Sequence, residues 1–164
     1  MTLRRTIVPS LWFDGDAEQA ADFYVSVFPN SRVASATRYP EGAPGPAGTV
    51  MAVEFELDGQ RFTGINGGPQ FPFTEAVSFQ VVCQDQDEID RYWAALTSEG
   101  GSEGPCGWCK DRYGLSWQVV PDGMDEMFDH GDPARAQRAM QAMLTMSKID
   151  LKAMREAADG VAAG

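Results

Sequence analysis

The residues with the most chemical potential gather in residues 104–121, which hold two of the three cysteines and two of the four tryptophans. Cys106 and Cys109 have the spacing of a dithiol redox pair, although in such enzymes the motif opens a helix whose amides lower the thiol pKa. Lys110 and Asp111 follow at once and have the chemistry of a charged clamp or an acid-base pair. The catalytic candidates of this stretch are therefore Cys106, Lys110 and Asp111.

The same stretch also favours a structural interpretation. β-Forming residues follow an Asp111–Gly114 turn, so the pattern predicts two short strands, in which residues three apart face opposite sides. A disulfide between Cys106 and Cys109 would then need a local bend, and the aspartate would stabilise its own turn. The aromatic residues of this hairpin, Trp108 and Trp117, are expected to lie in the core.

Composition limits the partners of the chain. A net charge of −11 on 164 residues argues against nucleic acid and against anionic membrane surfaces, and makes a neutral or cationic ligand easier to accept. We find no apolar run of signal-peptide or membrane-span length, so we expect a cytoplasmic protein. Three cysteines, an odd number, do not form a disulfide framework, so we expect reduced thiols. A zinc site built from Cys83, Cys106 and Cys109 is an alternative.

Hydrophobic alternation and helix-capping signals predict the order strand, helix, strand, strand, strand, which then begins again. The first helix follows Asp16 and the second follows Asp85, and Tyr24 corresponds to Trp93 at the same offset of 69 residues. Such a constant offset indicates an internal repeat. The proline- and glycine-rich segment 40–48 is expected to be a mobile loop, acting as a lid or lying uninvolved at the surface.

These patterns predict an α+β fold of two βαβββ modules in one structural domain. The first module spans 5–66, a linker 67–75, the second module 76–121 and a C-terminal helical extension 122–158. In the extension, Asp132 and a first-turn proline predict a helix whose methionines pack on the module or on a second copy, and Ser147–Asp150 interrupts it.

If the apolar strand faces pack on the helices, the opposite faces line a cleft. Amides, hydroxyls and two carboxylates there suit a small polar molecule, whereas the plainer alternative is that these are only the wetted faces of amphipathic strands. The expected lining residues are Leu11, Phe13, Glu54, Glu56, Asn66, Ser78, Gln80, Ser116 and Gln118.

Several motifs resemble the PhnB-like branch of the vicinal oxygen chelate superfamily, which includes glyoxalases, bleomycin-resistance proteins and extradiol dioxygenases. They are LWFDGDAEQAADFY at 11–24, INGGP at 65–69, DEID at 87–90, GW at 107–108, KDRYG at 110–114 and WQVVP at 117–121. The resemblance covers about residues 5–158 and implies two modules whose curved sheets enclose a cleft, often in a dimer. The branch has also carried a demethylubiquinone methyltransferase name, but the glycines at 67–68 lead into a predicted loop, so that activity is not expected.

The resemblance also places the superfamily's metal ligands, which are His, Glu or Gln on the first and last strands of each module. Their positions fall here at Pro9, near Gly64, at Ser78 and at Gln118, and only Gln118 offers a suitable donor. We therefore expect no metal and no cofactor. The single histidine, His130, is expected to be a surface or packing residue.

The resulting expectation is a protein that binds a small polar molecule in a cleft without the superfamily's metal ligands. Whether the protein also catalyses a reaction of this molecule stays open. The alternatives are a divalent-metal-dependent lyase, isomerase or dioxygenase with displaced ligands, and a drug-sequestering protein like the bleomycin-resistance proteins. A homodimer that buries exposed strand edges is expected, without nucleic acid or membrane partners.

Overall fold

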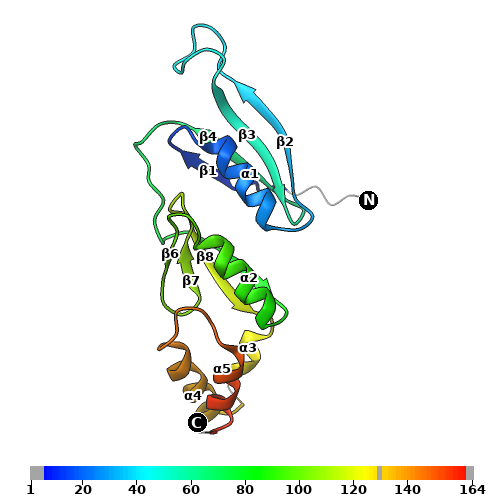
Figure 1. Cartoon of the computed structure of the whole chain (residues 1–164), viewed down its shortest axis with the longest axis vertical. Coiled ribbons are helices and arrows are strands. Elements are labelled where there is room, and N and C mark those ends of the chain that lie inside the picture. Colours follow the sequence, from blue (N-terminus) through cyan, green and yellow to red (C-terminus); the bar gives the residue numbers. More distant parts are fainter. Residues whose placement is uncertain (1–5, 129–130, 162–164) are drawn as a thin grey trace. The chain divides into compact units, whose positions relative to one another are not determined.

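The computed structural model describes residues 6–128 and 131–161, which form two compact units, Met1–Phe73 and Thr74–Gly164 (Figure 1). The boundary between the units falls inside the predicted linker 67–75. Each unit contains one βαβββ module, and the second also carries the helical extension, so the predicted fold class is confirmed. That the two units make one structural domain stays a prediction.

The first unit is a four-stranded sheet with one helix across it. Strand β1 lies parallel to β4, the other neighbours are antiparallel, and the sheet order is β1-β4-β3-β2. The elements are β1 (Ser10–Phe13), α1 (Ala17–Val27), β2 (Arg32–Arg38), β3 (Val50–Leu57) and β4 (Gln60–Asn66).

Helix α1 packs on one face of this sheet through aromatic side chains. Tyr24 of α1 lies 6.2 Å from Phe55 of β3, and Phe55 lies 5.4 Å from Phe62 of β4, measured between ring centroids. Strand alternation therefore places Val53, Phe55 and Leu57 in the core, as the pattern predicted, and leaves the opposite face of the sheet open.

The second unit repeats this plan, and Figure 1 shows α2 across its sheet as α1 lies across the first. Its sheet order, β5-β8-β7-β6, corresponds strand by strand to that of the first unit. Helices α1 and α2 each have 11 residues and begin 69 residues apart, so the predicted repeat is confirmed for the helices. The module consists of β5 (Ser78–Cys83), α2 (Gln86–Leu96), β6 (Ser102–Glu103), β7 (Trp108–Lys110) and β8 (Ser116–Pro121).

The first strands of the two modules do not follow the 69-residue offset. Phe13 faces α1 and Cys83 faces α2, which are 70 residues apart, because Gly15 adds one residue to the first strand–helix turn with φ +91°. A shift of one residue moves every side chain to the other face of a sheet. Leu11 and Phe13 are accordingly buried on the helix-covered face, and their predicted place on the open face is wrong.

Asn66 also lies on the helix side of its sheet rather than on the open face. Its side-chain oxygen accepts a hydrogen bond from the backbone N–H of Ala17 at 2.9 Å, and its amide nitrogen donates to the carbonyl of Val50 at 3.0 Å. Asp16 was expected to cap α1, but its side chain makes no capping bond. Asn66 therefore supplies the cap from the end of β4, and its side chain does not lie on the open face as predicted.

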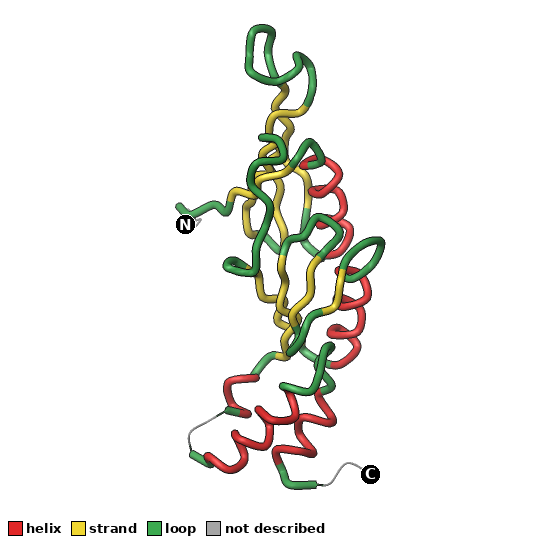
Figure 2. The backbone as a smooth tube through the Cα atoms, turned by 90° about the vertical axis from the view of Figure 1, so that its left-hand side faces the viewer, coloured by secondary structure: helices red, strands yellow, loops and turns green. Residues whose placement is uncertain are grey.

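The C-terminal extension folds onto the second unit. Asp132 caps α4 as predicted, by accepting from the backbone N–H of Arg135 at 3.0 Å. The break between α4 and α5 spans residues 144–150 and so begins three residues before the predicted Ser147–Asp150. Figure 2 shows the extension helices gathered beyond the strands of this unit. His130 lies outside the described residues. The extension helices are α3 (Met124–Met127), α4 (Pro133–Met143) and α5 (Leu151–Ala158).

Main-chain bonds join the extension to the hairpin of the second module. Cys106 N–H donates to Met146 O at 2.8 Å and Gly107 N–H donates to Ser147 O at 2.7 Å. Ile149 is fully buried beside them. The extension methionines divide between core and surface, since Met143 and Met154 are buried while Met140 is 40% exposed. No described helix has the length and apolar character needed to cross a membrane.

Candidate functional site

The open face of the second sheet brings together five of the twelve predicted site residues. In the β-ladder Ser78 lies opposite Ser116, and Ser116 lies opposite Lys110 on its other side. Gln118 occupies the next position on the same face, between Gln80 and Trp108, and its side-chain nitrogen lies 2.8 Å from the Ser78 hydroxyl. The aromatic Trp108 is thus half-buried on the open face and not in the core, whereas Trp117 is buried as predicted.

A cavity of about 500 Å³ lies on this part of the second unit. Its wall combines one lysine, two glutamates, two serines and the Trp108 side chain, which suits a small polar molecule with an apolar part. The lining residues are Glu75, Ser102, Glu103, Gly104, Pro105, Trp108, Cys109, Lys110 and Ser116.

An ion pair forms one side of the cavity. The Lys110 ammonium lies 2.6 Å from the Glu75 carboxylate, and both side chains are partly exposed. The hydrogen bond from Lys110 is the main reason why the pKa of Glu75 lies below its ordinary value. Sequence reasoning missed Glu75, because nothing in the predicted linker 67–75 indicates that one of its residues pairs with β7.

Ser116 is the most deeply buried of the polar residues that line the cavity. It has no surface accessible to water, and its hydroxyl has no hydrogen-bond partner in the described part of the chain. Buried hydroxyls are normally paired, and leaving one unpaired costs about 1–3 kcal/mol. This orphaned group, next to Lys110, marks the cavity as a place where a bound molecule would complete the hydrogen bonding.

Asp111 serves the hairpin and does not face a ligand. Its carboxylate accepts from the backbone N–H groups of Tyr113 at 2.8 Å and Leu115 at 3.2 Å, and from the Trp117 indole at 2.8 Å. The residue is 2% exposed. Of the alternatives for Asp111, the structure supports the turn-stabilising one.

The cysteines form no disulfide, since all three are free. Burial raises the pKa of the Cys83 and Cys109 thiols from 9.0 to about 12, so both stay protonated at neutral pH. Cys106 lies in a turn with φ +58° and is half-buried. The described residues contain no cluster of three or more His, Cys, Asp or Glu side chains that could hold a metal ion.

On the open face of the first sheet, ion pairs with arginines neutralise the two glutamate carboxylates. Glu56 accepts two hydrogen bonds of 3.0 Å from Arg32, and Glu54 lies 3.8 Å from Arg61. The two carboxylates predicted to attract a cation therefore each have an arginine partner. On β1 this face carries Trp12, whose indole donates to the carbonyl of Gly68 at 2.8 Å.

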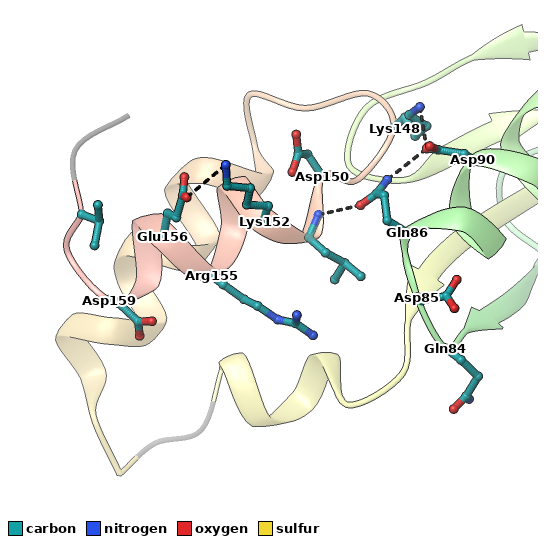
Figure 3. A pocket seen from close by; sticks show the side chains of 12 residues that line it. Gln84, Asp85, Gln86, Asp90, Lys148, Asp150, Lys152, Arg155, Glu156 and Asp159 are labelled. Atoms are coloured by element: carbon teal, nitrogen blue, oxygen red, sulfur yellow. Dashed lines mark hydrogen bonds and ion pairs between the residues drawn. The ribbon is translucent and has the colours of Figure 1, made fainter. Parts of the chain in front are cut away.

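Two other cavities are lined by side chains that make contacts within the fold. One of about 730 Å³ lies beside the 40–48 loop in the first unit, where the Tyr39 hydroxyl donates to the Asn66 carbonyl at 2.7 Å. The other, of about 560 Å³, lies between α2 and α5 (Figure 3). There Lys148 pairs with Asp90 at 2.6 Å, and the Gln86 side chain bonds both Asp90 and the main chain of the extension.

The positions that correspond to superfamily metal ligands do not fit a divalent ion. Gly64 has no side chain, and a Cβ added there would lie 3.3 Å from Ala17 on the helix side. The hydroxyl of Ser78 and the amide of Gln118 bond each other, so neither is a strong ligand.

The fold is that of a PhnB-like protein of the vicinal oxygen chelate type. The family model described as 3-demethylubiquinone-9 3-methyltransferase matches residues 5–120, and the chain belongs to this family. A search of curated proteins found no match.

Solved structures agree with this assignment. A putative 3-demethylubiquinone-9 3-methyltransferase, PhnB protein, from Bacillus cereus is 36% identical, with 71% of this chain and 99% of that chain covered and a TM-score of 0.64. A Pseudomonas aeruginosa protein is 21% identical, with 73% and 100% covered and a TM-score of 0.58. The fosfomycin resistance protein FosX from Listeria monocytogenes is 12% identical, with 79% and 100% covered and a TM-score of 0.57. The last two show the fold alone.

The raised thiol pKa values generate a prediction for alkylation. At pH 8 we expect iodoacetamide to label Cys106 and neither of the other two cysteines of the folded protein. The Cys83 and Cys109 thiols are buried and have pKa values of about 12. Their protonated forms stabilise the fold below about pH 9, and this contribution is lost as the pH rises toward 12, since the folded-state pKa exceeds the unfolded one. Mass spectrometry counts the labels, and Cys106→Ser is the control. Labelling of the folded Cys106→Ser variant at pH 8 would contradict the assignment.

Proposed function

We propose that this chain is a binding protein of the PhnB-like branch and that it holds a small polar molecule in the cavity on the open face of the second sheet. The observation that carries the proposal is the buried Ser116 hydroxyl without a partner, next to Lys110. Folding normally satisfies such a group internally, so a partner from outside the chain is the simplest way to satisfy it here. Trp108 supplies the apolar wall of the same cavity.

Turnover of the ligand is not part of the proposal. Asp111 is committed to the hairpin and the Cys109 thiol is protonated at neutral pH, so Lys110 and Cys106 are the candidates that stay open to chemistry. The residues also do not favour the methyltransferase activity in the family's description. A nucleotide-type methyl donor is commonly held by a glycine-rich turn that opens a helix, whereas Gly67 and Gly68 lead into a loop.

A homodimer belongs to the proposal. Strand β2 is the edge of the first sheet, and all seven of its residues are exposed. Such an edge presents unpaired main-chain groups, which proteins usually cover. A second copy of the chain is the occupant we infer for the exposed edges. A cytoplasmic location stays a prediction, supported by the three free cysteines.

Three probes that share one ring test the binding proposal: benzamide, benzylamine and benzoate. We expect at least one of them to shift the Trp108 indole and Ser116 amide signals in ¹⁵N-¹H spectra. Ser116→Ala should weaken that probe about fivefold, because one hydrogen bond is worth about 1 kcal/mol. The same variant should unfold at no lower urea concentration, because the hydroxyl that it removes has no partner.

Ser26→Ala, at an exposed serine of α1, is the matched control and should change neither property. If none of the three probes moves either signal at millimolar concentration, the binding proposal is wrong. If the probe binds equally well to Ser116→Ala, Ser116 is not the contact that carries it.

The assembly has its own test. We expect sedimentation velocity at micromolar concentration to show a species of twice the chain mass, because a second copy would cover the exposed edges. Dilution to nanomolar concentration should shift the distribution toward the monomer. A single monomeric species throughout the micromolar range would contradict the dimer.

A further inference from the structure

The cavity presents two hydrogen-bond donors side by side. Lys110 and Ser116 are direct partners in the antiparallel pairing of β7 and β8, so their side chains leave the same face of the sheet next to each other. An ammonium group donates only, and the Ser116 hydroxyl has its proton free for an acceptor. Two adjacent donors, one of them charged, match a group that carries two acceptor oxygens and a negative charge.

The chain itself already brings such a group to this place. The Glu75 carboxylate lies 2.6 Å from the Lys110 ammonium and comes from the segment before β5, outside the sheet. Its side chain is 62% exposed, and an exposed ion pair adds little to stability. Glu75 is therefore easily displaced from Lys110.

The other acidic groups that could attract a cationic ligand are tied to the fold. Glu103, which also lines the cavity, accepts from the Trp93 indole at 2.9 Å. On the first sheet, Glu54 and Glu56 pair with arginines. A cationic ligand thus meets no carboxylate without a partner among these residues, which removes the reason to expect one.

We propose that the ligand of this cavity carries a carboxylate. In the free protein the Glu75 carboxylate occupies the position beside Lys110 that the ligand carboxylate takes when it binds. This inference rests on the proposed function. The ligand carboxylate replaces Glu75 at the Lys110 ammonium and accepts from the Ser116 hydroxyl, while Trp108 contacts the apolar part of the molecule. Opening of the Glu75–Lys110 pair uncovers Ser116, which no water reaches in the free protein.

The charge of the site favours a monoanion. Lys110 is the one cation among the lining residues, which also include two glutamates. A doubly charged phosphate would keep an uncompensated charge beside them, whereas a carboxylate exchanges one negative charge for another. The net charge of −11 does not oppose this exchange strongly, because charges more than about 10 Å away are screened at 0.1 M salt.

The experiment titrates benzoate into the full chain and into three variants, with the Trp108 indole signal as the readout. Glu75→Gln removes the internal competitor and should bind benzoate about two- to fivefold more tightly, the range that an exposed ion pair allows. Lys110→Met should lose measurable benzoate binding. Glu54→Gln is the matched control, because Glu54 is, like Glu75, an exposed glutamate with an ion-pair partner, and the benzoate affinity of this variant should not change.

Benzamide separates the failure of this inference from the failure of the proposed function. It has the same ring without the charge, so Glu75→Gln should leave its affinity unchanged. If benzamide or benzylamine binds at Trp108 but Glu75→Gln does not strengthen benzoate, the carboxylate inference is overturned and the binding function stands. If no probe binds to the chain or to any variant, both fall.

Discussion

The buried carboxylate of Asp111 is the constraint on which the second module depends. It accepts two backbone N–H groups of its own turn and the indole N–H of Trp117, and so joins the turn to the core. A buried anion is tolerated only when such donors surround it, which makes this geometry demanding. The turn then fixes the register of β7 and β8, and that register places Lys110 beside Ser116.

The C-terminal extension supports the same hairpin from its other end. The family match ends at residue 120, and the chain that follows bonds the turn at Cys106 and Gly107. Gly107 has φ +81°, and a Cβ there would lie 2.7 Å from the carbonyl of Val119 and 3.1 Å from Ile149. Glycine is thus required where hairpin and extension meet. Because Pro105 of this turn lines the cavity, the extension helps to hold the cavity wall.

Local signals predicted much of the fold, and a single residue explains the main error. Caps, apolar stripes and strand alternation located both module helices and most strands, because each of these signals depends only on residues that are close together in the sequence. The additional Gly15 changed the strand offset from 69 to 70 and reversed the faces of Leu11 and Phe13. Ser116 and Lys110 were both candidates from the sequence, and the pairing of β7 with β8 brings them side by side. Glu75 and the capping role of Asn66 depend on contacts between distant segments, which no local pattern reveals.

The most direct test of this account is hydrogen exchange at the Trp117 indole in the Asp111→Asn variant. The amide of asparagine has one acceptor oxygen and no charge, so we expect exchange at Trp117 to quicken by about tenfold or more, as loss of a charged hydrogen bond implies. The Trp93 indole, bonded to Glu103, is the internal reference and should keep its rate. Equal exchange rates at Trp117 in both proteins would show that the hairpin, and the cavity built on it, do not depend on Asp111.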